Sequence, residues 1–173
     1  MSSRLGRVLS DRPRFNSRIH ALVEVIVDDE SMSAEPFASP SRSLISRPGE
    51  FAVLRLPVGA DVPAPTAGSS LLDAVVRTPD ETSVVRSWSD PLVKSTEASR
   101  RAGPFRAWSI PGTLDFELVG VLVGFIEPLR DAGVPILAIS TFETDWILVD
   151  ATRATAAESA WIAAGVRLLD RVD

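Results

Sequence analysis

The chain has 173 residues, of which 45% are hydrophobic and 24% charged, and its formal net charge is −5. This length and composition fit one soluble globular domain or two small ones, and the acidic balance disfavours a nucleic-acid partner, because phosphate backbones attract basic surfaces. The absence of cysteine excludes disulfides and thiolate chemistry, and a single histidine, His20, disfavours a Ser-His-Asp triad or a histidine metal site.

The first 49 residues differ in composition from the rest. They are polar and arginine-rich, and residues 28–49 are rich in serine and proline, which is typical of a flexible linker. We expect residues 1–49 to form a largely flexible N-terminal extension. The apolar run at 118–126 ends at Glu127 and is too short to span a bilayer, and no targeting segment is evident. We therefore expect a cytoplasmic protein with no membrane partner.

The following residues, 50–100, predict a short all-β segment. A strand is expected over 51–56, where "FAVLRL" stops at a proline. Two further strands, over 72–78 and 82–88, flank the turn "PDE". Residues 90–103 are expected to be a polar connector.

Residues 105–170 predict a complete β-α-β-β-α-β order. A strand over 105–112 is followed by apolar residues at helical spacing from Leu118 to Leu129, with Asp115 as the expected N-cap and Gly133 as the helix end. Strands over 134–140 and 146–149, a helix opened by the capping box Thr155-x-x-Glu158, and a strand over 166–169 complete the order. This is the α+β, ferredoxin-like order.

The two halves repeat one another. Phe51 aligns with Phe105 at an offset of 54, and residues 75–85 align with 138–148 at an offset of 63. The nine residues by which the offset grows are missing where the first half would carry the longer helix, and prolines there discourage a helix. We interpret residues 50–100 as a reduced copy of the unit at 105–170.

The segments "TPDETSVV" and, above all, residues 112–149 resemble the ACT-domain proteins. The nearest resemblance is to the tandem type related to arginine sensors and to the regulatory part of aspartate kinases, and it covers residues 50–170. It implies a ferredoxin-like βαββαβ fold with two ACT units, the first one reduced. It also implies a regulatory, non-catalytic role without a cofactor or metal, and an amino acid bound between ACT units, in a protein expected to be a homodimer.

The resemblance places the ligand site in two segments. One is the loop into the first helix, where backbone N–H groups hold a carboxylate, and the other is the turn between the second and third strands. By position, the implied ligand-binding residues are Asp115, Glu117, Leu118, Val119, Gly120, Val121, Ser140, Thr141, Phe142 and Asp145. The carboxylates of Asp145, Glu143 and Asp115 suit an ammonium group or a basic side chain, the Thr141 hydroxyl orients the ligand, and Phe142 offers an apolar or cation–π wall.

Plainer interpretations remain open for the same residues. Asp115 is also explained as a helix N-cap, residues 143–145 as a solvated turn, and Gly120 with Gly124 as helix packing against a sheet. The function has an alternative as well, a ligand-free dimerisation or protein-interaction module of the same fold. Catalysis by the carboxylates is disfavoured, because no histidine, cysteine or phosphate-binding loop accompanies them.

Overall fold

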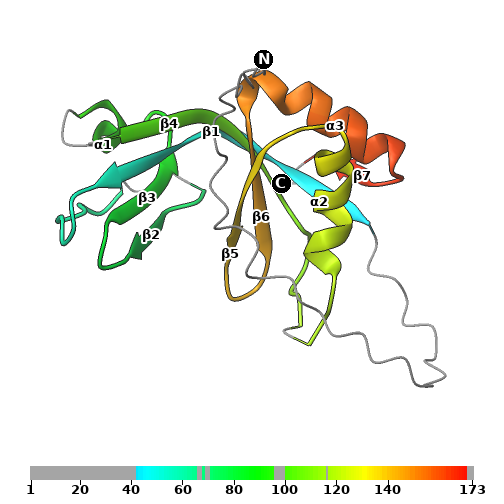
Figure 1. Ribbon diagram of the computed structural model, residues 1–173, viewed down its shortest axis with the longest axis horizontal. Coiled ribbons are helices and arrows are strands. Elements are labelled where there is room, and N and C mark those ends of the chain that lie inside the picture. Colours follow the sequence, from blue (N-terminus) through cyan, green and yellow to red (C-terminus); the bar gives the residue numbers. More distant parts are fainter. Residues whose placement is uncertain (1–41, 66–67, 69–70, 96–99, 116, 171–173) are drawn as a thin grey trace, which may run out of the picture. The chain divides into compact units, whose positions relative to one another are not determined.

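The computed structural model describes residues 42–65, 68, 71–95, 100–115 and 117–170 (Figure 1). The predictions for residues 1–41, including the first part of the N-terminal extension, lie outside the described residues. The described elements are, in chain order, β1 (Ser43–Leu56), β2 (Ala74–Arg77), β3 (Thr82–Ser87), α1 (Pro91–Lys94), β4 (Arg100–Ser109), α2 (Val121–Asp131), β5 (Ile136–Ser140), β6 (Asp145–Asp150), the 3-10 turn η1 (Ala151–Arg153), α3 (Ala154–Ala163) and β7 (Arg167–Leu169).

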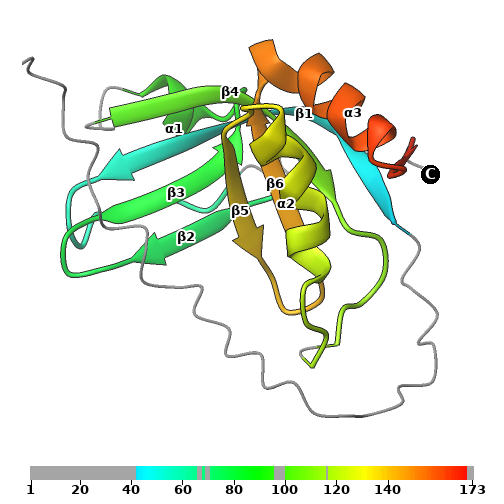
Figure 2. The same ribbon diagram turned by 45° about the vertical axis from the view of Figure 1, so that its right-hand side comes forward.

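The strands of the described residues form one sheet with the order β2-β3-β1-β4-β6-β5, and β7 pairs with β1 outside this path (Figures 1 and 2). The order is symmetric about the β1–β4 pair, so β3 and β2 flank β1 as β6 and β5 flank β4. The element sequence β4-α2-β5-β6-α3-β7 confirms the predicted α+β, ferredoxin-like fold. The last strand of that series, β7, pairs in parallel with residues 43–45 of β1.

The strand register follows the sequence repeat. Phe51 pairs with Ser87 in the first half, and Phe105 pairs with Asp150 in the second. The offset of 54 relates Phe51 to Phe105, and the offset of 63 relates Ser87 to Asp150, so the two pairs are equivalent in the repeat. Phe51 and Phe105 also face each other across β1 and β4. Because register decides which side chains face the core, the match shows that both halves share one strand arrangement.

The expected boundary near residue 50, between the flexible extension and the first unit, is wrong, because strand β1 crosses it. The strand begins at Ser43, so residues 43–49 are strand and not linker. Residues 45–47 pair with β4, while Leu44 is fully buried in the same core cluster as Trp108. The serine- and proline-rich composition predicted a linker, but pairing with β4 and β7 holds this stretch in the sheet. The polar connector expected over 90–103 is likewise wrong, since it contains α1 and the start of β4.

The second half is covered on one face by helices α2 and α3 (Figures 1 and 2). Trp108 and Trp161 are both fully buried there, with an edge-to-face contact between ring centroids 5.0 Å apart. The indole N–H of Trp161 donates to the Phe125 carbonyl oxygen at 2.8 Å, so α3 is joined to α2 as well as to the sheet. Alternate residues of β6, Trp146 and Leu148, pack into a second apolar cluster on the opposite face.

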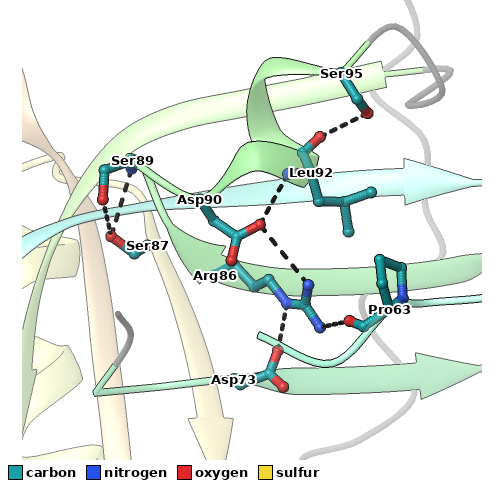
Figure 3. A network of polar contacts seen from close by, with 8 residues as sticks. All are labelled: Pro63, Asp73, Arg86, Ser87, Ser89, Asp90, Leu92 and Ser95. Atoms are coloured by element: carbon teal, nitrogen blue, oxygen red, sulfur yellow. Dashed lines mark hydrogen bonds and ion pairs between the residues drawn. The ribbon is translucent and has the colours of Figure 1, made fainter. Parts of the chain in front are cut away.

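Among the described residues of the first half, α1 is the only helix on the corresponding face, and Ala60 and Val62 from the segment after β1 pack there as well. A buried arginine, Arg86, organises this region, with 2% of its surface exposed (Figure 3). Its Nε donates to Asp73 Oδ1 at 2.7 Å and its Nη2 donates to the Pro63 carbonyl oxygen at 2.5 Å. Asp90 lies 3.8 Å away and accepts from the Leu92 N–H, which caps α1.

Two predicted helix starts are wrong. Helix α2 begins at Val121 with Gly120 as its N-cap, so Asp115 is not the cap; Asp115 Oδ1 accepts instead from the Glu117 N–H at 3.0 Å, within the preceding loop. Helix α3 begins at Ala154, and no side chain caps it. The turn before it is capped by Asp150, whose Oδ1 accepts from the Thr152 N–H at 2.9 Å.

The predicted end of α2 is confirmed. The helix stops at Asp131, and Gly133 follows in the left-handed conformation with a φ of 65°. In the part of the chain that the structure describes, no helix has the length and hydropathy needed to cross a bilayer.

Candidate functional site

A pocket of about 250 Å³ lies between the N-terminal end of α2, the loop before it and the β5–β6 turn. It brings together two segments that are separate in the sequence, residues 114–123 and residues 140–145. Of the ten residues expected at the site, eight line this pocket: Asp115, Leu118, Gly120, Val121, Ser140, Thr141, Phe142 and Asp145. Glu117 and Val119 do not line it, and Val119 is 89% exposed.

Five further residues line the pocket beyond the expected set: Leu114, Leu122, Val123, Glu143 and Thr144. Glu143 was expected as a carboxylate partner for an ammonium group, and Thr144 lies in the same polar turn. Leu122 was assigned to the helix core by its spacing, and its contact with the pocket follows from its place in the first turn of α2. Leu114 and Val123 had no signal of their own.

The β5–β6 turn is closed by its two threonines. The Thr141 N–H and hydroxyl donate to the Thr144 carbonyl oxygen at 2.9 and 2.8 Å, and the Thr144 N–H donates to Thr141 Oγ1 at 3.2 Å. The Thr144 hydroxyl donates to the Ile110 carbonyl oxygen at 2.7 Å. Both hydroxyls therefore have a structural role in the turn, as the plainer interpretation of these residues expected.

Backbone hydrogen bonds fasten the α2 loop to this turn. The Leu114 N–H donates to the Glu143 carbonyl oxygen at 2.7 Å, and the Ile110 N–H donates to the Asp145 carbonyl oxygen at 3.1 Å. The Ser140 hydroxyl donates to Asp145 Oδ1 at 2.5 Å. Among the described residues Asp145 Oδ2 has no hydrogen-bond partner, so one oxygen of this carboxylate is available to a ligand.

The N-terminal end of α2 supplies the opposite polarity. Gly120 has a φ of 78°, a left-handed conformation that favours glycine, and no side chain caps the helix. A Cβ at Gly120 would meet nothing within 4 Å, so the space in front of the helix is open. The first-turn N–H groups of the helix have no intrahelical acceptor and carry the positive end of its dipole. The site thus offers N–H donors at one wall.

Three carboxylates, of Asp115, Glu143 and Asp145, also line the pocket, and no basic side chain does. This lining suits a group that presents a cation together with an acceptor for the helix N–H groups. No group of three histidine, cysteine, aspartate or glutamate side chains within the described ranges is placed to hold a metal ion.

The rim of the pocket is apolar and exposed. Leu118 is 45% exposed, Val123 53% and Phe142 78%, and all three line the pocket. Val119, which follows Leu118 in the loop before α2, is more exposed than any of these three side chains. Clustered exposed apolar side chains around a polar site are typical of a surface that another molecule covers.

Comparison with known families gives one match, in which residues 103–160 correspond to the family described as ACT domain. This segment contains both walls of the pocket. The match confirms the resemblance to ACT-domain proteins for residues 103–160, which lie within the second half of the chain. No match was found among curated proteins.

Several solved structures are similar to this chain. Protein Atu0741 from Agobacterium tumefaciens is 25% identical, with coverage of 76% of this chain and 94% of that one and a TM-score of 0.64. Protein VC0802 from Vibrio cholerae, described as of unknown function and a possible transport protein, is 20% identical, with coverage of 69% and 87% and a TM-score of 0.51. The regulatory subunit of aspartate kinase from Thermus thermophilus is 12% identical, with coverage of 67% and 93% and a TM-score of 0.45.

Proposed function

We propose that this chain, which carries an ACT domain over residues 103–160, is a non-catalytic regulatory protein that binds an amino acid in the pocket between α2 and the β5–β6 turn. The ACT-domain match and the fold support the regulatory role. Amino-acid binding is the further step, and it depends on the chemistry of the pocket. The proposal includes a cytoplasmic location, as expected from the sequence.

The observation that carries the proposal is the pairing of an uncapped helix N-terminus with a carboxylate wall. An α-amino acid presents a carboxylate and an ammonium on one carbon. The first-turn N–H groups of α2 suit the carboxylate, and Asp145 Oδ2 suits the ammonium. The remaining carboxylates, of Asp115 and Glu143, favour a ligand with additional positive charge.

The apolar rim supports a second part of the proposal, in which the pocket is closed by a second copy of the chain. Leu118, Val123 and Phe142 are exposed apolar side chains that line the open pocket, and Val119 is a further exposed apolar side chain of the loop before α2. A homodimer that buries this rim would exclude water from the bound amino acid and strengthen its polar contacts.

The structural use of both turn threonines favours a second candidate, the ligand-free interaction module. If the turn is only a scaffold and the exposed rim is only an interface, the fold serves dimerisation or partner docking without a ligand. The two candidates differ in whether any amino acid stabilises the protein.

A thermal-shift scan of the full chain against the twenty standard amino acids tests the proposal. A ligand that binds the folded state adds about 2.7 kcal/mol at roughly 100 times its Kd, which raises the Tm by several degrees. Asp145→Asn should abolish the shift, because it removes the carboxylate charge but keeps an acceptor for Ser140. A matched control, Asp61→Asn, changes an exposed carboxylate in the first half and should leave the shift intact. A scan without any response contradicts amino-acid binding and favours the interaction module.

A further inference from the structure

A second cavity, a groove of about 460 Å³, lies at the start of β5, whereas the first pocket lies at the end of β5. The two cavities share no lining residue. We propose that this groove is a separate binding site for an apolar amino acid of about the size of leucine or phenylalanine. This inference goes beyond the proposed function, since it concerns another site formed by other residues.

The wall of the groove is apolar and combines both halves of the sheet. Val53 comes from β1, Phe105 from β4 and Leu137 from β5. All three are half-buried and pack against the same cluster of buried residues, which includes Phe51 and Trp146. Because the buried cluster supports them, these side chains form a preformed surface for an apolar group. The volume also falls within the usual range of about 300–1,000 Å³ for small-molecule sites.

One side of the groove carries a pair of opposite charges. Asp150 ends β6 and Arg153 ends η1, and both line the groove. Asp150 Oδ1 accepts from the Thr152 N–H at 2.9 Å and from the Thr152 hydroxyl at 2.5 Å, which fixes the carboxylate. These bonds, and then the charge of Arg153, lower the pKa of Asp150, so this group is ionised at neutral pH.

The two charges interact without contact. The charge of Arg153 helps to lower the pKa of Asp150, yet within the described residues no ion pair of 4.0 Å or less joins the two side chains. Asp150 Oδ2 also has no hydrogen-bond partner among those residues, and the guanidinium of Arg153 makes one long bond, at 3.5 Å, to the Gly133 carbonyl oxygen. A zwitterion fits this arrangement, with its ammonium on Asp150 Oδ2, its carboxylate on Arg153 and its side chain on the apolar wall.

Titration of the ¹⁵N-labelled full chain with L-phenylalanine, followed by NMR, tests the site. We expect the amide resonances of Phe105, Leu137 and Thr152 to shift together. Two matched probes separate the charges, because 3-phenylpropionate lacks the ammonium and phenethylamine lacks the carboxylate. Each should bind about tenfold or more weakly, since each loses one charge-assisted hydrogen bond. Equal binding of either probe overturns the zwitterion assignment.

Variants of the chain give the second readout. Arg153→Gln should weaken phenylalanine binding about tenfold, and Ala102→Trp should block the groove, since Ala102 is an exposed lining residue. Arg167→Gln, an exposed arginine on β7, is the matched control and should change nothing. Asp145→Asn should leave this binding intact, which separates the groove from the first pocket. The inference is wrong if phenylalanine shifts only resonances near Gly120 and Thr141, or shifts none.

Discussion

The β2–β3 hairpin of the first half and the β5–β6 hairpin of the second close through the same turn. The Thr78 N–H donates to the Glu81 carbonyl oxygen at 2.9 Å, as the Thr141 N–H does to Thr144 at 2.9 Å. In both turns the threonine hydroxyl donates to that same oxygen, at 3.3 Å in the first half and 2.8 Å in the second. The turn is therefore a feature of the repeat, and the pocket beside the second copy arises from α2 and its loop.

The two halves differ more in how they cover the sheet. Arg86 on β3 and Val149 on β6 occupy equivalent register positions and are both buried, at 2% and 0% exposure. In the second half Val149 packs under the helices, whereas in the first half Arg86 binds a loop through Asp73 and the Pro63 carbonyl oxygen (Figure 3). In the first half, a buried cation with polar partners thus occupies the position at which the second half has an apolar contact with the helices.

The largest expected effect tests this replacement. Arg86→Ala removes the cation and leaves the Asp90 carboxylate, which is 3% exposed, without its neighbour, so we expect a loss of about 3–5 kcal/mol in the free energy of unfolding. Val149→Ala is the matched variant in the second half and should lose about 2 kcal/mol, from lost burial and a small cavity. Urea unfolding measures both. If Arg86→Ala loses no more than Val149→Ala, Arg86 contributes packing volume alone.

A smaller effect tests the equivalence of the turns. Thr78→Val and Thr141→Val each remove the hydroxyl bonds that close one turn, and each should lower the free energy of unfolding by about 1 kcal/mol. The same urea experiment compares them. Unchanged stability in Thr141→Val would show that its hydroxyl is dispensable to the turn, and would leave ligand contact as its role.

The smallest effect is a difference in acid sensitivity between the turns. Glu81 accepts from the Ser83 hydroxyl at 2.7 Å and from Arg55 Nε at 2.6 Å, and these contacts lower its pKa below 4.5. A lowered folded-state pKa contributes stability above that pH, and the contribution is lost as the pH falls through the folded-state value. The contribution is small, since Glu81 is a surface group.

We therefore expect thermal unfolding of Glu81→Gln to show a shallower fall in Tm below pH 4.5 than the unchanged chain does. Arg55→Gln should flatten the same part of the profile in part, because it removes one of the two contacts. The equivalent position of the second half is Thr144, which has no acid to titrate in this range. Identical profiles in all three proteins would contradict the assignment of acid sensitivity to this turn.

The local sequence pattern determined much of the secondary structure of this protein. Apolar runs bounded by turn residues predicted a strand at each of β2 to β7, although the first part of β4 was expected to be a connector. The register of the pairs agrees with the offsets of the repeat, because pairing follows the side-chain pattern of each strand. The polar turn beside the first pocket stood out in the sequence, but it was the resemblance to ACT-domain proteins that named both segments. Their approach to one another was an expectation from resemblance, and the backbone bonds between Leu114, Glu143, Ile110 and Asp145 show how the fold achieves it.

Tertiary structure alone decided three features, each of which depends on contacts between distant residues. Residues 43–49 have a linker-like composition, and only pairing with β4 and β7 makes them a strand. Gly120 and not Asp115 is the cap of α2; Asp115 lies in a loop that is bonded to the β5–β6 turn through the Leu114 N–H and the Glu143 carbonyl oxygen. The groove at the start of β5 joins residues from 53 to 153, so it exists only once both halves share one sheet.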